Sequence, residues 1–241
     1  MKLSDFDVLS FDCYGTLVDW ESGIYTGLTP LLTRSGADLS RDAVLEEFSR
    51  FESRQQALVP SMPYSELLAV VHGQLADAWG VAADPAEDAR FGGSVADWPP
   101  FRDTVEALRY LKQHFQLVIL SNVDRASFQA TNRLLGVAFD AIHTAQDIGS
   151  YKPDPRNFAY LLDRVKEQGV EREKLLHVAQ SLFHDHVPAN AVGLASAWID
   201  RRHATGGSGA TAPVSADVRY DFRFTSLGAL VVAHRAEVGG A

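Results

Sequence analysis

The sequence predicts an α/β fold, a doubly wound parallel sheet that carries an inserted helical cap. Three observations favour it: short apolar runs that end in polar residues recur along the chain, helix-like stretches separate these runs, and the strand pattern disappears between the first run and Trp98-Pro99-Pro100. A chain of 241 residues suits one medium domain with a smaller insertion better than two independent domains. We therefore expect residues 1–17 and 99–241 to form the core and residues 18–98 to form the cap.

The predicted strands deliver polar residues to one edge of the sheet. The first, Val8–Phe11, stops at Asp12 and a turn that contains Gly15. Three later runs have the same form: Gln116–Leu120 before Ser121-Asn122, Ala141–Ala145 before Tyr151-Lys152-Pro153, and Leu175–Ala179 before Gln180-Ser181. Because ligands in open parallel sheets bind beyond the carboxyl ends of the strands, Asp12 is a better catalytic candidate than a carboxylate on a helix surface.

Helical patterns account for much of the remaining chain. They cover Thr104–Gln113 and Asn157–Lys166 between the strands, and Ala43–Phe51 and Tyr64–Trp79 in the expected cap. Pro99-Pro100 marks the return to the core, since proline cannot continue a helix. Towards the C-terminus, residues 204–210 have the composition of a flexible connector, and a last strand is expected at Tyr220–Phe224.

The composition excludes several classes of function. The net charge of -9 argues against nucleic-acid binding, which depends mostly on Lys and Arg contacts to phosphates. The single cysteine, Cys13, can form neither an internal disulfide nor a zinc cluster, which favours a reducing compartment. Asp5 and Asp7 interrupt any signal sequence, and no segment has the roughly 20 apolar residues of a membrane span. We expect a cytoplasmic protein without nucleic-acid or membrane partners.

Four short motifs occur in order along nearly the whole chain. They read Phe11-Asp12-Cys13-Tyr14-Gly15-Thr16-Leu17, Leu120-Ser121-Asn122, Tyr151-Lys152-Pro153-Asp154-Pro155 and Ser181-Leu182-Phe183-His184-Asp185. This order, with a cap between the first two motifs, resembles the haloacid dehalogenase superfamily. The resemblance implies a Rossmann-like core, a nucleophile at Asp12, a cation at Lys152 and a final acid at Asp185.

The chemistry of these residues agrees with the resemblance. A carboxylate can act as a nucleophile and form an ester that water cleaves, provided that nearby cations and donors hold it ionised and aimed. Lys152 would supply the charge. Hydrogen bonds to Asp12 or to a substrate carboxylate would come from Thr16, Ser121 and Asn122. Thr16 and Asn122 can equally be plain turn residues, and Asp12 can be a helix cap.

Two positions distinguish this chain from the phosphatases of the superfamily. Those enzymes carry a second aspartate two residues after the nucleophile, and a Gly-Asp pair in the fourth motif whose aspartate binds magnesium. Here the positions hold Tyr14 and Ala179-Gln180. Magnesium prefers hard, usually anionic oxygen ligands, which a neutral amide does not supply. We predict no catalytic metal and no cofactor, with a magnesium-dependent phosphatase of small phosphomonoesters as an alternative, and we expect Tyr14, Gln180 and Ser181 to contact substrate.

The Asp-x-Tyr-Gly-Thr pattern is similar to the L-2-haloacid dehalogenase branch (type II). In that branch an aspartate attacks C2 of an (S)-2-haloacid with inversion, halide leaves, and the ester is hydrolysed. An arginine from the cap takes part, and the candidates here are Arg50, which we favour, and Arg54. A guanidinium can grip a carboxylate or stabilise a departing anion, although either arginine can also be a solvated residue on a helix face.

The fourth motif departs from the dehalogenase pattern and points to a second relative. It lacks an asparagine and gains a histidine, and the tyrosine usual after the lysine motif is Phe158. The chain also carries the motifs Phe-Asp-Cys-Tyr-Gly-Thr-Leu (11–17), Gln-Asp-x-Gly-Ser-Tyr-Lys-Pro (146–153) and His-Asp-His (184–186). With these it is similar to azetidine-2-carboxylate hydrolases, in which a ring nitrogen leaves instead of halide. Trp20 or Trp79 could then provide an aromatic face for an amine, or could simply be core.

The last acid of the fourth motif would act on the water that cleaves the ester. Asp185 would orient or deprotonate this water, and His184 or His186 would either assist or merely pack. The expected partner is a small carboxylic or amino-acid substrate. A catalytically silent binding module is the least favoured alternative, because nucleophile, lysine and final acid are all present. Homodimerisation is left open, since apolar helix faces can belong to a core or to an interface.

Overall fold

The computed structural model describes residues 1–204, 209–211, 214 and 217–240, and its centre is a six-stranded parallel sheet. The strand order is β3-β2-β1-β4-β5-β6. The strands are β1 (Val8–Phe11), β2 (Gln116–Ser121), β3 (Ala141–Thr144), β4 (Leu175–Ala179), β5 (Ala195–Ile199) and β6 (Phe222–Phe224). The chain leaves β1 for one side of the sheet and later returns to the other, so β1 and β4 flank the point where strand order reverses, the usual place for a ligand in such sheets.

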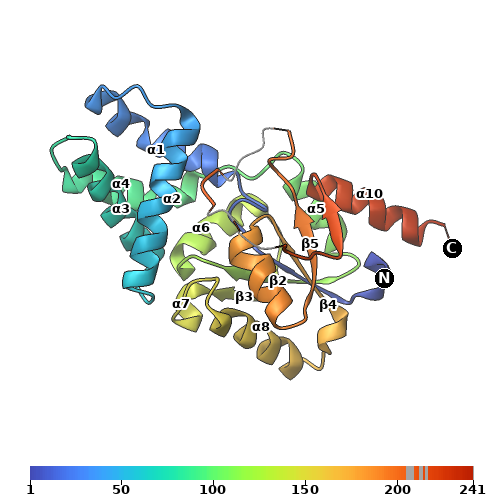
Figure 1. The fold of residues 1–241 in the computed structure, drawn as a ribbon. Helices are drawn as coiled ribbons and strands as arrows, with labels where there is room; N and C mark the ends of the chain where they lie inside the picture. Colours follow the sequence, from blue (N-terminus) through green and yellow to red (C-terminus); the bar gives the residue numbers. More distant parts are fainter. Residues whose placement is uncertain (205–208, 212–213, 215–216, 241) are drawn as a thin grey trace.

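Helices cover both faces of this sheet, so the central strands are fully buried and mostly apolar (Figure 1). The helices of the sheet region are η1 (Leu3–Asp5), α5 (Thr104–Leu111), α6 (Arg125–Leu135), α7 (Ala145–Ile148), α8 (Pro155–Glu167), η3 (Arg172–Lys174), η4 (Leu182–His186), α9 (Val187–Ala191) and α10 (Leu227–Val238). One face, with Leu9 and Phe11, packs against α5, α6 and α10. The opposite face, with Val8 and Leu175, packs against α8 and α9.

A helical layer lies beside the sheet and comes from the chain between β1 and α5 (Figure 1). It contains α1 (Trp20–Ser35), α2 (Arg41–Leu58), α3 (Tyr64–Ala78), α4 (Pro85–Gly93) and η2 (Ser94–Asp97). Side-chain caps start three of these helices: Asp19 for α1, Ser40 for α2 and Asp84 for α4. The chain enters and leaves this layer side by side, because Val18 bridges to Pro100. The cap boundaries of 18 and 98 remain a prediction.

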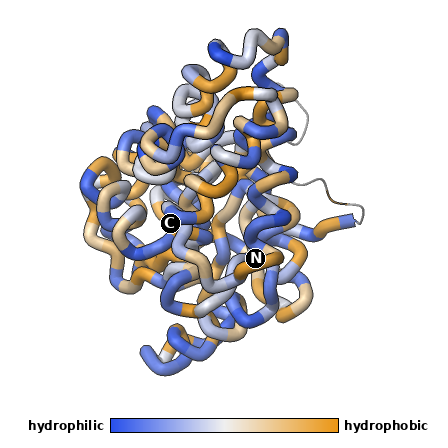
Figure 2. The backbone as a smooth tube through the Cα atoms, turned by 90° about the vertical axis from the view of Figure 1, so that its left-hand side faces the viewer, coloured by the Kyte–Doolittle hydropathy of each residue, from blue (hydrophilic) through white to orange (hydrophobic). Residues whose placement is uncertain are grey.

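The helical layer shares one hydrophobic core with the sheet. Leu28, Phe48 and Leu75 from the layer belong to the same buried cluster as Phe11 and Val178 from the strands. Figure 2 shows hydrophobic and hydrophilic residues alternating along most helices, as amphipathic packing requires. Burial of this continuous cluster fixes the layer over the carboxyl ends of the strands.

The predicted fold class is confirmed, with differences in detail. The expected strands at Val8–Phe11 and Leu175–Ala179 have these bounds in the structure, whereas the last strand is shorter than expected and begins at Phe222. Strand β5 has no counterpart among the predictions, since Ala195-Ser196-Ala197 gives no long apolar run. Residues 205–208 of the expected connector lie outside the described residues.

Candidate active site

The turn after β1 aims the Asp12 side chain and bonds it to Thr16. Asp12 Oδ2 accepts a hydrogen bond from Thr16 Oγ1 at 2.7 Å. The turn is held by the Cys13 carbonyl, which accepts from the backbone N–H groups of residues 16, 17 and 18. Gly15 adopts φ +94°, a conformation that side chains rarely tolerate. The polar turn predicted from the first motif therefore presents one buried carboxylate beyond the strand end.

Lys152 connects the first and last acids of the motif set. Its Nζ donates to Asp12 Oδ1 at 2.9 Å, to Asp185 Oδ1 at 2.6 Å and to the Leu120 carbonyl at 2.9 Å. The lysine is only 1% exposed, so this ammonium and both carboxylates are removed from water. Strand β2, the loop before α8 and the segment after β4 thus meet at one point.

Burial and charge act in opposite directions on these groups. Burial and the neighbouring Asp185 carboxylate raise the pKa of Asp12 by more than the Lys152 ammonium and the Thr16 hydroxyl lower it. Burial also disfavours the charge of Asp185, but Lys152 and His177 outweigh it and hold the pKa of that carboxyl well below its usual range. The two neighbouring acids therefore raise the pKa of Lys152 against the effect of its own burial. Lys152 therefore keeps its positive charge. Of the two carboxylates, Asp12 is less stabilised in its ionised form than Asp185.

His177 in β4 supports Asp185 and was missed by the sequence reasoning. Its Nε2 lies 2.9 Å from Asp185 Oδ1, and its Nδ1 lies 2.9 Å from Ser10 Oγ. Because Asp185 is an acceptor, the Nε2 atom carries the proton and Nδ1 accepts from Ser10. A histidine in the middle of an otherwise apolar strand was the available signal, since a buried polar group needs partners.

A small cavity opens between this cluster and the helical layer. The residues that line it are Asp12, Tyr14, Trp20, Glu52, Gln56, Tyr64, Asn122, Lys152, Gln180, Ser181, His184, Asp185 and Thr211. Three of them come from α2 and α3, namely Glu52, Gln56 and Tyr64. The sequence reasoning did not select these three, or Thr211. The spacing of Phe48, Glu52 and Gln56 along one apolar helix face was the signal that could have identified two of them.

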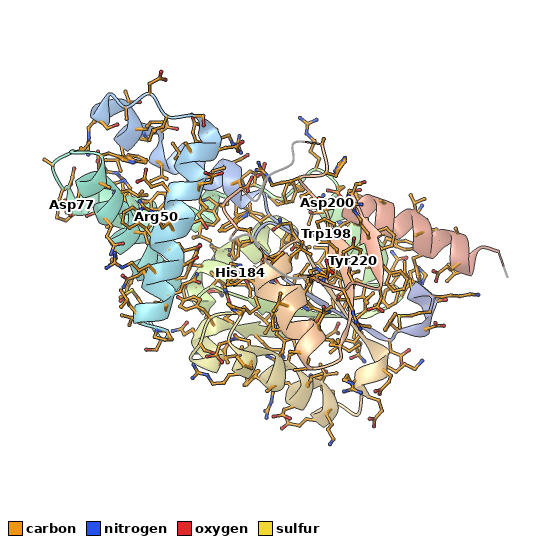
Figure 3. The ribbon with its side chains drawn as sticks, viewed as in Figure 1. Arg50, Asp77, His184, Trp198, Asp200 and Tyr220 are labelled. Carbon is orange, nitrogen blue, oxygen red and sulfur yellow. The ribbon has the colours of Figure 1, made fainter. Side chains whose placement is uncertain are left out.

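Arg50 does not reach this cavity, which corrects the preferred choice of arginine. Its side chain is 69% exposed, bonds to Glu47 and lies over the Phe51 ring. Figure 3 shows Arg50 on α2 in the helical layer, well separated from His184. At about 100° per residue, a position two residues before Glu52 points to nearly the opposite side of the helix. Arg54 is exposed as well and does not line the cavity.

The remaining predicted residues divide into lining and positioning groups. Asn122 bonds to the backbone of Lys152 with both amide atoms, at 2.7 and 3.0 Å, and so fixes the lysine. Ser181 Oγ accepts from the His184 backbone N–H, and Tyr14 Oη bonds to Thr131. Ser121 Oγ is buried and has no hydrogen-bond partner among the described residues.

Two of the predicted aromatic and histidine candidates lie elsewhere. His186 bonds to Ser196 and to the Ala179 carbonyl, does not line the cavity, and therefore packs. Trp79 donates to Glu47 outside the cavity, whereas Trp20 lines it. Burial lowers the pKa of His184 to about 4, so this lining imidazole is neutral near pH 7.

The donor set at this site suits an ammonium better than a divalent cation. Lys152 Nζ already stands between Asp12 and Asp185. The two lining positions at which the magnesium-dependent phosphatases carry acids hold Tyr14 and Gln180. Within the described part of the chain, no group of three His, Cys, Asp or Glu residues is arranged to hold a metal.

The parallel sheet, the helical insertion and the Asp–Lys–Asp cluster define a hydrolase of the haloacid dehalogenase type. A family model for haloacid dehalogenase-like hydrolases matches residues 6–179. The chain belongs to this family.

The chain is also similar to individual members of the family. A solved L-2-haloacid dehalogenase is 26% identical with a TM-score of 0.74, covering 94% of this chain and 98% of that one. The L-2-haloacid dehalogenase of Xanthobacter autotrophicus, with chloropropionic acid covalently bound, has a TM-score of 0.76 at 20% identity, covering 98% and 100% of the two chains. An (S)-2-haloacid dehalogenase of Pseudomonas putida is 28% identical over 127 residues, 52% of this chain and 54% of the relative. The match thus spans about half the length of the curated relatives.

Among the described helices, none has the length and apolarity needed to cross a membrane.

Proposed function

We propose that this hydrolase uses Asp12 to displace a leaving group at C2 of a small carboxylic acid, without a metal, as in (S)-2-haloacid dehalogenation. The observation that carries the proposal is the position of Lys152, whose ammonium bonds to Asp12 and Asp185 at the base of the cavity. A buried carboxylate that is aimed by a hydroxyl and paired with a cation has the features of a nucleophile.

The first step forms an ester. An oxygen of Asp12 bonds to C2 of the substrate, the bond from C2 to the leaving group breaks, and its electron pair departs with the leaving group. Attack from the side opposite the leaving group inverts C2. Thr16 holds one Asp12 oxygen and Lys152 the other, so the carboxylate enters the reaction already oriented. Ser121 Oγ is buried without a partner among the described residues, but Ser121 does not line the cavity, so its contact with the substrate carboxylate stays a prediction.

The second step releases the product. Water attacks the ester carbonyl carbon of Asp12, the 2-hydroxy acid leaves, and the Asp12 carboxylate re-forms. Asp185 Oδ2 is buried and unbonded among the described residues, so it can accept a hydrogen bond from this water. Because the pKa of Asp185 is held low, we assign it the role of orienting the water rather than that of a strong base.

A second candidate is hydrolytic ring opening of L-azetidine-2-carboxylate, which would use the same two steps with a ring nitrogen as leaving group. One feature of the cavity supports it as an alternative: no arginine lines the cavity in the described residues, whereas Trp20 and Glu52 do. A phosphatase is not supported, because Tyr14 and Gln180 replace the two acids that magnesium-dependent members carry.

Oxygen labelling tests the proposal. In H2(18)O, with enzyme in excess over (S)-2-chloropropionate or L-azetidine-2-carboxylate and with EDTA present, the label should enter Asp12 and not the 2-hydroxy acid. Mass spectrometry of the peptide that contains Asp12 gives the result, and Asp12→Asn provides an inactive control. Label that appears first in the product would mean direct attack by water and would rule out the ester mechanism.

A further inference from the structure

We propose that Glu52 determines substrate selection, by pairing its carboxylate with a positively charged nitrogen on the substrate. The inference rests on the proposed function of the Asp12 site and adds a residue and a substrate class to it: a 2-substituted carboxylic acid that carries an ammonium group.

The position of Glu52 is the first part of the argument. It projects from α2 into the same cavity as Asp12 and Lys152, and it is 3% exposed. Tyr64 Oη donates to Glu52 Oε1 at 2.7 Å, which holds the carboxylate at the cavity wall. The acid belongs to the helical layer and the nucleophile to the sheet, so a bound substrate would lie between the two.

The absence of a cationic partner is the second part. Among the described residues, no Lys, Arg or His forms an ion pair with Glu52. Burial consequently raises the pKa of Glu52 to about 7, and the Tyr64 hydroxyl offsets this only in part. A buried carboxyl that lacks a cation costs stability, and such groups gather at functional sites.

The charge balance of the whole cavity is the third part. Its described lining holds the carboxyl groups of Asp12, Glu52 and Asp185 against the single ammonium of Lys152, and His184 is neutral. A 2-haloacid would add a further negative charge to this acidic cavity. A zwitterionic amino acid adds no net charge, and its ammonium supplies what Glu52 lacks.

The chemistry balances for a strained cyclic amino acid with a protonated ring nitrogen. Asp12 bonds to C2, the bond from C2 to nitrogen breaks, and the electron pair goes to nitrogen, which leaves as a neutral amine. Water then cleaves the ester, and the proton that this releases passes to the amine. Glu52 would hold the nitrogen before and after these steps, and relief of ring strain would compensate for the poor leaving ability of an amine.

Binding measurements test Glu52 without requiring turnover. L-alanine and propionate have similar shapes, and only L-alanine has an ammonium group at C2. We would measure the Kd of each by NMR titration at pH 8 for the wild type, for Glu52→Gln and for Glu46→Gln. Glu46 is an exposed acid on the same helix and provides the matched control. Thermal unfolding checks that each variant is folded.

We expect Glu52→Gln to weaken L-alanine binding by about 10- to 100-fold, the range for a lost charge-assisted hydrogen bond, with propionate binding unchanged or tighter. Glu46→Gln should change neither. Equal affinity of the wild type and Glu52→Gln for L-alanine would overturn the proposal, as would a parallel loss for both ligands or undetectable L-alanine binding by the wild type. A failed labelling experiment with the expected binding pattern would reject the ester mechanism and leave the role of Glu52 standing.

Discussion

Replacing Glu52 by Gln should stabilise the ligand-free protein increasingly as pH rises. The unfolded carboxyl ionises near its ordinary value of 4.5, whereas burial moves the folded pKa to about 7. Between these values the folded state binds more protons than the unfolded state, so this group makes the protein less stable as pH rises, up to the folded pKa. Gln keeps an acceptor for the Tyr64 hydroxyl and carries no charge.

The size of the effect follows from the two pKa values. Integrating the proton uptake of this one group between pH 5 and pH 8 lowers the free energy of unfolding of the wild type by about 2.5 kcal/mol. Glu52→Gln lacks the group and does not show this decrease. For a chain of this length, the difference in Tm between Glu52→Gln and the wild type should therefore widen by roughly 5 to 10 °C from pH 5 to pH 8. The phenols that face Glu52, Tyr64 and Tyr151, stay neutral over this range, because burial raises the pKa of both.

Urea unfolding at half-unit pH steps is the assay, with Glu46→Gln as the control for removal of an exposed acid from the same helix. The quantity to follow is the difference in free energy of unfolding between Glu52→Gln and the wild type, in which other titrating groups cancel. A difference that stays flat from pH 5 to pH 8 would refute the argument that Glu52 is buried without a cation.

Three further outcomes are expected. Lys152→Met should abolish turnover and cost about 3–5 kcal/mol in the free energy of unfolding, because two buried carboxylates lose their common partner; retained activity would exclude the lysine from the mechanism. Arg50→Ala should leave kcat/KM within about twofold and stability within about 0.5 kcal/mol, as for other exposed side chains, whereas a large loss of activity would mean that the arginine enters the site. Excess EDTA should leave turnover of either 2-substituted acid unchanged, and activity that EDTA removes and magnesium restores would contradict the metal-independent proposal.

The fold was predictable because its central strands are buried on both faces. Val8–Phe11 and Leu175–Ala179 are fully buried, mostly apolar runs, each with one polar residue, and both end in polar turns, a pattern with few other interpretations. Strand β5 was not predictable in this way, because it lies towards the edge of the sheet and contains Ser196 and partly exposed Trp198. Strand β5 forms because neighbouring strands bury it, and its own residues do not reveal these neighbours.

The sheet side of the site was more predictable than its helical side. Asp12, Lys152 and Asp185 follow strands or their connecting loops, and parallel topology alone brings such residues to one edge. On α2 the resemblance to the dehalogenases directed attention to Arg50 and Arg54, and Glu52 was not considered. Which helix face meets the sheet decides the outcome, and the apolar face set by Phe48 carries Glu52 inward.

The three hydrogen bonds that Lys152 donates determine how the charge of the Asp12, Lys152 and Asp185 cluster changes during the proposed reaction. An ammonium has three protons, and all three are donated, to Asp12, to the Leu120 carbonyl and to Asp185. None is left for the substrate while the nucleophile is free. When Asp12 becomes an ester it loses its charge, and the lysine then balances Asp185 alone. The charge of the cluster thus alternates between one negative charge and none in each catalytic cycle, so the covalent intermediate is the state in which this buried cluster is neutral.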